Sequence, residues 1–308
     1  MRALNVYLDC GSYQRAVPFL IERYSSLSEV ASVTSQRAEE QGPIHGCKGG
    51  NDYFGNTLHA SKGWSGFSNT QELKKKMVMG VQDTEVLDKV TRFTKKARAE
   101  DVQKYCKLKR DVCGGSVDIP RYLTGTPDCM IGIVKSSSRS KFIRIGVASG
   151  FTCDVSIDTV NAVGMALARA VKALELAKYR VGLDVAAVHA SIDHDACAAM
   201  VIPVKTTNAS LNLSRLMFPL SDPSFFRGVS FGWVARVGLI PNRSGLSTRA
   251  DQMWYRSETA DLRAQMLEQI FGKDHICFDV NELCDRYIRD KDVDKLYDYI
   301  MTVLLDLE

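Results

Sequence analysis

One serine of the chain has the spacing of a catalytic nucleophile. Residues 228–232 read Gly-Val-Ser-Phe-Gly, which matches the G-x-S-x-G pattern with Ser230 at its centre. In hydrolases with this pattern, the glycines permit a sharp turn between a strand and a helix that exposes the serine hydroxyl. The residues before Ser230 form a poor core strand, and Gly238 and Pro241 interrupt the segment after it. We therefore predict no catalytic residues and keep a serine hydrolase at Ser230 as the less favoured alternative.

A second group of polar residues follows a predicted strand at 183–188. This group contains His189, Asp193, His194 and Asp195. Ligands of α/β sheets bind at the carboxyl ends of strands, and these side chains suit a divalent metal or proton transfer. Such residues in a polar loop are more often simply solvated. An enzymatic site in this loop therefore ranks below a binding function.

The common motifs for nucleotides and metals are absent from the sequence. The one Gly-Lys pair, at residues 272–273, is followed by Asp274, which excludes an ordinary P-loop. Neither G-x-G-x-x-G after a predicted strand nor H-E-x-x-H occurs. The nine cysteines are scattered without a C-x-x-C pair, so neither a disulfide framework nor a zinc site is indicated. We expect no cofactor and no metal.

Charge is distributed very unevenly along the chain. Residues 74–110 contain twelve lysines and arginines against five acids, a net charge of +7, and residues 251–308 contain seven against fourteen, a net charge of −7. Apolar residues from Val86 to Ala97 recur at helical spacing, so the cations occupy the opposite face of a predicted helix. A basic helix face suits phosphate binding, and solvated lysines are the alternative. The acidic region could contact a protein partner, a neighbouring subunit or this basic face, or only increase solubility.

Aromatic residues lie beside the basic stretch, in a glycine-rich loop at 42–66. Cations that follow phosphates and rings that stack on bases together hold single-stranded nucleic acid. The expected phosphate contacts are Lys74, Lys75, Lys76, Lys95, Lys96, Arg98, Lys107, Lys109, Arg110, Arg139 and Lys141. The expected stacking residues are Tyr53, Phe54, Trp64 and Phe67. The alternative is that Trp64 and Phe67 only attach the loop to the core.

The elements that must position these residues change in type along the chain. A short strand and a helical segment occupy residues 1–41, and helices are predicted from Ser68 to Gly80 and from Asp83 to residue 113. Strands at 130–134 and 142–147, a long helix from Ser156, and strands at 183–188 and 199–204 follow, and the chain is helical after residue 250.

A strand, a long helix and a second strand predict a right-handed crossover on a mostly parallel sheet. The expected fold class is α/β, with a mostly parallel sheet and a long crossover helix, basic N-terminal helices and a helical C-terminal region. We divide the chain into regions 1–128, 129–248 and 249–308. Residues 143–190 resemble von Willebrand A-like folds, whose metal-binding members carry D-x-S-x-S after the first strand. Residues 146–150 read Gly-Val-Ala-Ser-Gly instead, so that metal chemistry is not carried over.

Composition indicates a large folded protein. The chain has 308 residues, 45% of them apolar and 25% charged, with a net charge of +4. Its apolar runs are far shorter than the ~20 residues of a membrane span, and no signal peptide is visible. We expect a cytoplasmic protein without a membrane partner, and a homo-oligomer because closed oligomers are common.

In length, basic middle and acidic helical end, the chain resembles the single-stranded-DNA-binding RNA-polymerase cofactors of phages that carry their own virion RNA polymerase. The resemblance implies preferential binding of single-stranded DNA, a fold unlike the OB-fold, and recruitment of a phage RNA polymerase in the host cytoplasm. It assigns no individual residue. We predict a non-enzymatic, sequence-tolerant single-stranded DNA-binding protein that acts as a phage transcription cofactor. The main alternative is a non-catalytic von Willebrand A-like protein-interaction module.

Overall fold

A computed structural model describes most of the chain. The described residues are 2–9, 14–41, 66–105, 108–113, 115–133, 141–150, 155–190, 197–234, 236–237 and 260–305. No helix among them is long and apolar enough to cross a membrane.

The centre of the molecule is a six-stranded sheet with the order β1-β2-β8-β7-β6-β9. Its strands are β1 (Arg2–Asp9), β2 (Gln14–Arg23), β6 (Phe142–Ser149), β7 (Arg180–Ala190), β8 (Cys197–Lys205) and β9 (His275–Asp279). The pairs β2/β8, β6/β7 and β6/β9 are parallel, whereas β1/β2 and β7/β8 are antiparallel. The predicted α/β class with a mostly parallel sheet is confirmed. The sheet takes strands from before residue 128 and from after residue 249.

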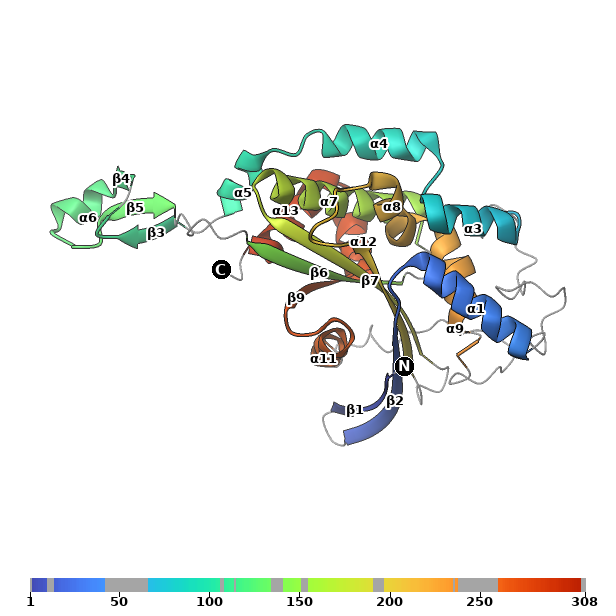
Figure 1. Cartoon of the computed structure of the whole chain (residues 1–308). Helices are drawn as coiled ribbons and strands as arrows, with labels where there is room; N and C mark the ends of the chain where they lie inside the picture. Colours follow the sequence, from blue (N-terminus) through green and yellow to red (C-terminus); the bar gives the residue numbers. More distant parts are fainter. Residues whose placement is uncertain are drawn as a thin grey trace.

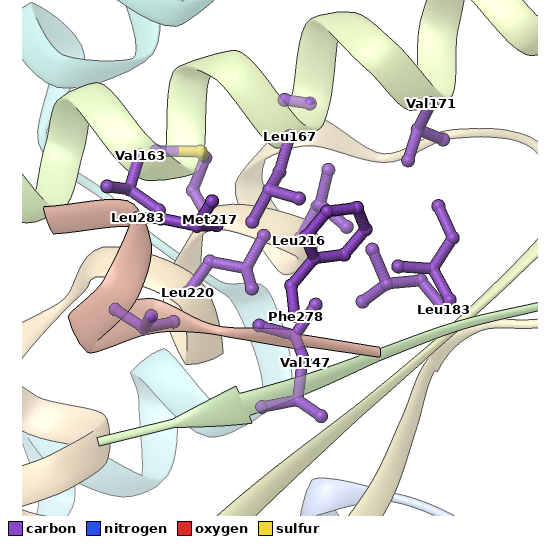
Figure 2. Packing of buried hydrophobic residues seen from close by; sticks show 14 of the residues in the cluster. Val147, Val163, Leu167, Val171, Leu183, Leu216, Met217, Leu220, Phe278 and Leu283 are labelled. Atoms are coloured by element: carbon purple, nitrogen blue, oxygen red, sulfur yellow. The ribbon is translucent and has the colours of Figure 1, made fainter. Parts of the chain in front are cut away.

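The predicted crossover helix is α7 (Ile157–Leu176), which connects β6 to β7. The Ser156 side chain caps it by accepting a hydrogen bond from the Thr159 backbone N–H, as the sequence predicts. Twelve of its twenty residues are buried, because it packs on the sheet and against four helices, α4 (Thr84–Thr94), α8 (Leu213–Ser221), α12 (Val280–Asp290) and α13 (Val293–Leu305). Figure 2 shows side chains from α7 and α8 meeting Val147 and Phe278 of the strands. Truncating one such residue, Leu167, to Ala costs about 2–5 kcal/mol in cores of this kind.

Helices cover both faces of the sheet (Figure 1). The α7 face carries α3 (Thr70–Met79), α4 (Thr84–Thr94), α5 (Ala99–Tyr105), α8 (Leu213–Ser221), α12 (Val280–Asp290) and α13 (Val293–Leu305). Near one end of the sheet lie α1 (Leu27–Gln41), the π-helix η1 (Phe225–Ser230) and α9 (Phe231–Val234). The opposite face is covered by α11 (Ala260–Phe271), which packs on a second apolar cluster. Gly146 lets α11 approach β6, since a Cβ there would lie 2.6 Å from Cγ of Phe271.

Part of the predicted basic helix is a strand. The sequence pattern predicts helix up to residue 113, but α5 ends at Tyr105 and Leu108–Asp111 forms β3. β3 pairs with β5 (Met130–Ile133), which also pairs with β4 (Ser116–Val117), and α6 (Ile119–Leu123) follows β4. The predicted strand at 130–134 therefore belongs to this small three-stranded sheet and not to the large one. Pairing with a distant partner overrides the local helical pattern here.

Candidate functional site

The amphipathic pattern of α4 is confirmed and fixes its cations in place. Asp83 caps the helix by accepting hydrogen bonds from the backbone N–H groups of Glu85 and Val86. Val90 is fully buried, and the same side of the helix packs against α7 and α8. The opposite side is exposed. We define the α4 basic face as the exposed residues Lys89, Arg92, Lys95, Lys96 and Arg98.

Acidic neighbours engage two of these five cations. Lys89 Nζ lies 2.7 Å from Glu85, and this hydrogen bond raises the pKa of Lys89. Lys96 Nζ lies 3.6 Å from Asp294 of α13. The acidic C-terminal region thus contacts the basic face of its own chain, one of the expected possibilities. Both side chains of the Lys96–Asp294 pair are more than half exposed, so the pair contributes less than ~1 kcal/mol and a phosphate can compete with it.

The three consecutive lysines of α3 do not share one role. The cap of α3 is Asn69 rather than the predicted Ser68, and Lys74 and Lys75 are exposed. Lys76 points inward, and its Nζ lies 2.8 Å from the Gly66 carbonyl and 3.0 Å from Asp222. A third bond, of 2.9 Å, joins it to the hydroxyl of Ser224. Its ammonium group is fully used inside the molecule, so the prediction that Lys76 contacts phosphate is wrong.

Among the predicted stacking residues, the structure describes Phe67 alone. Phe67 packs against the main core, and its ring lies so close to Gly228 that a Cβ there would be 2.7 Å away. It attaches the loop to the core, as the alternative interpretation has it. Tyr53, Phe54, Trp64, Lys107 and Arg139 lie outside the described residues. Lys109 and Arg110 lie on β3 instead of on the predicted helix.

Lys141 is placed beside an aromatic residue at the start of β6. Its Nζ lies 5.3 Å from the centre of the Tyr179 ring and 3.4 Å from the Tyr179 hydroxyl. The neighbouring Phe142, Arg144 and Arg180 are exposed, and the sequence interpretation missed all three. The signal was present, since alternation with the buried Ile143 and Ile145 puts Phe142 and Arg144 on the same face of the strand.

The sequence offers two candidate enzyme sites, one at Ser230 and one at the group that begins with His189, and these two residues are in contact in the structure. His189 Nε2 and the Ser230 hydroxyl are hydrogen-bonded, but His189 is 5% exposed and Ser230 is 0% exposed. Burial lowers the pKa of His189 to about 4, so the imidazole is neutral at pH 7. Ser230 ends η1 and continues directly into α9, whereas a nucleophile elbow presents its serine at a sharp turn. Asp193, His194 and Asp195 lie outside the described residues.

A second buried polar group lies beside this pair. The Glu22 carboxylate accepts hydrogen bonds from both terminal nitrogens of Arg37, at 2.6 and 2.9 Å. It also accepts from the Tyr24 hydroxyl and from Trp233 Nε1 at 2.9 Å. These groups satisfy one another inside the molecule. Within the part of the chain that the structure describes, no cluster of three potential metal ligands occurs.

Comparison with known proteins identifies a family and no function. A family model described as a domain of unknown function, DUF7192, matches residues 12–272. No curated protein and no solved structure matches the chain.

Proposed function

The chain belongs to the DUF7192 family, whose function is unknown, and we propose from its own residues that it binds single-stranded nucleic acid without sequence preference. The observation that carries this proposal is the α4 basic face. Burial of the apolar side of α4 prevents the helix from turning its cations away from solvent. Arg92, Lys95 and Arg98 form no ion pair with another described residue, so they are available to phosphates.

The charge pattern along α4 favours a single strand over a duplex. Asp83, Glu85 and Asp88 lie in the N-terminal half of the helix, and the unpaired cations lie at its C-terminal end. Recognition helices usually present their N-terminal residues to the bases in the major groove. Three carboxylates at that end would repel the phosphates on either side of the groove. A surface contact along one flexible strand avoids this repulsion.

The binding predicted here is electrostatic and therefore sensitive to salt. Five phosphate contacts on a single strand correspond to a slope of log K against log[salt] of about −3.5. Fluorescence anisotropy with labelled single-stranded and double-stranded DNA of one sequence, at several salt concentrations, measures this slope and the preference. Absence of binding at low salt would overturn the proposal.

A triple variant tests the assignment of the face. Lys95→Ala, Lys96→Ala and Arg98→Ala together should weaken binding of all sequences at least tenfold and make the slope shallower by about 2. The matched control is Lys273→Ala, Arg289→Ala and Lys295→Ala, which removes the same charge from exposed residues of the acidic region. The control should bind like the unmodified chain. An equal loss in both variants would show that only total charge matters.

A second function, binding of a protein partner, is favoured by the small sheet and α6. Val112, Val117, Ile119, Tyr122 and Leu123 are 43% to 77% exposed, and α6 has no buried residue. A three-stranded unit needs an apolar face that something covers. We propose the phage RNA polymerase implied by the resemblance as this partner. Tyr122→Ser with Leu123→Ser should abolish capture of the polymerase and leave DNA binding intact, and unchanged capture would reject the assignment.

A further inference from the structure

We propose that Phe142, Arg144 and Arg180, at the end of the large sheet where β6 and β7 begin, form a stacking platform for an unpaired nucleobase. The proposal rests on the proposed single-strand binding and adds to it the place where a base is held. We call these three residues the sheet-end platform.

Among the described elements, no helix covers the end of the sheet face on which the platform lies. Phe142 is 62% exposed, although it lies in a strand whose neighbouring residue Ile143 is buried. On the same face, four residues further along β6, Gly146 is covered by the Phe271 ring of α11. The covering helix therefore ends before it reaches Phe142. An exposed aromatic ring beside cationic side chains is the kind of surface on which the bases of a single strand stack.

Neighbouring groups hold the platform in one geometry. Phe142 and Arg180 are register partners in the parallel pair β6/β7, and the Arg180 guanidinium carbon lies 5.8 Å from the centre of the Phe142 ring. Arg180 also donates a hydrogen bond of 3.2 Å to the side chain of Asn208. The register partner of Arg144 is Gly182, which adds no side chain to this face. A planar ligand can therefore approach Phe142 with little ordering of the protein.

The chemistry of these side chains matches a base and its phosphate. Every base has a π-face that stacks on an aromatic ring, and guanidinium groups both stack and pair with phosphate. Arg144 Nη1 lies 2.7 Å from Asp274, so Arg144 already forms an ion pair with a carboxylate. We therefore assign the phosphate contact to Arg180, whose described partners are a neutral amide and the Phe142 ring.

Helix α7 connects the platform to the α4 basic face. The Arg169 guanidinium carbon lies 5.0 Å from the centre of the Phe93 ring of α4. From Arg169 to the end of α7 at Leu176 the helix advances only about 10 Å. The exposed Lys178 and then Arg180 follow directly. The α4 basic face lies on the α7 side of the sheet and Phe142 on the α11 side, so a strand that contacts both must pass around the end of the sheet.

Abasic DNA separates stacking from charge, because it keeps the phosphates and lacks the bases. We would measure the anisotropy of labelled oligo(dT) and of an abasic oligomer of equal length. Phe142→Ala should weaken oligo(dT) binding about tenfold, as expected for loss of one base stack, and leave the salt slope unchanged. It should bind the abasic oligomer as the unmodified chain does. Phe142→Trp should retain oligo(dT) affinity, and its tryptophan emission should fall on binding.

The control variant is Ile288→Ala, which truncates a 42% exposed apolar residue on α12 and should change neither affinity. If Phe142→Ala binds oligo(dT) like the unmodified chain while the α4 triple variant is weakened, the platform is wrong and the proposed function stands. If the unmodified chain binds neither oligomer, both proposals fail. Circular dichroism should show the same thermal unfolding for all these variants, because both truncated side chains are exposed.

Discussion

The large sheet has two unlike ends. Where β7 finishes, Glu22 and His189 are buried and every described partner is another side chain of the same chain. Where β6 and β7 begin, Phe142 and Arg180 face solvent. We call these the closed end and the open end. In α/β proteins, ligands usually bind at the carboxyl ends of parallel strands, and for the parallel strands β6, β7 and β9 this is the closed end.

The difference in hydrogen bonding indicates a separate role for each end of the sheet. Buried polar groups stabilise a fold only when they satisfy one another, and the Glu22 and His189 groups do so. Because the described polar groups at the closed end form hydrogen bonds with one another, few of their donors and acceptors are left for a ligand. At the open end, Arg180 has only a neutral side chain and an aromatic ring as described partners. The residues described at the usual ligand-binding end thus have a structural role, and the stacking platform that we propose lies at the opposite end.

The largest expected effect comes from breaking the closed end at Glu22. Burial alone would raise the pKa of Glu22, but hydrogen bonds from Arg37, Tyr24 and Trp233 lower it, so the side chain is ionised in the fold. Glu22→Ala leaves the Arg37 guanidinium without its carboxylate in a largely buried position. Removal of one partner from such a pair costs about 3–5 kcal/mol. Urea unfolding at pH 7 measures the loss.

The matched substitution at the open end is Arg144→Ala. The Arg144–Asp274 pair is more than half exposed on both sides, so its removal should cost less than ~1 kcal/mol. Equal losses of stability for Glu22→Ala and Arg144→Ala would remove the distinction between the two ends.

Local patterns were sufficient to predict helix α4 and the crossover through α7, although not the exposed residues of the open end. The spacing of Val86, Val90 and Phe93 predicts the buried side of α4, and Asp83 and Ser156 mark the helix starts that the structure has. Likewise, the crossover from β6 through α7 to β7 follows from one strand, one long helix and one strand in sequence. These features depend on residues within one or two turns of each other.

The closed end depends on residues far apart in the chain, and this is why the sequence did not reveal it. Glu22 bonds Trp233 across 211 residues, and His189 meets Ser230 across 41 residues. The sequence offers His189 and Ser230 as separate candidates for chemistry, but their contact is set by tertiary packing. In the same way, β3 was predicted as helix because its partner β5 is about 20 residues away.

The next prediction concerns the pH dependence of the free energy of unfolding, which His189 at the closed end should cause. Its expected size is smaller than that of Glu22→Ala. Burial lowers the pKa of His189 to about 4, whereas a histidine of the unfolded chain has a pKa near 6.5. Above pH 6.5 the side chain is neutral in both states and contributes no pH dependence. Between pH 6.5 and 4 the unfolded chain binds a proton that the folded chain does not. The free energy of unfolding should therefore fall by about 3 kcal/mol across this window.

Two variants show whether His189 causes this fall. His189→Asn removes the titrating group, so its free energy of unfolding should decline less steeply below pH 6.5, by up to ~1.4 kcal/mol per pH unit. Ser230→Ala removes the hydrogen bond but keeps the buried imidazole, and its decline should stay as steep as in the unmodified chain. Urea unfolding at half-unit pH steps measures all three proteins. If His189→Asn declines as steeply as the unmodified chain, protons reach the imidazole in the folded state. The closed end would then be open to solvent, and Ser230 would regain its place as a candidate nucleophile.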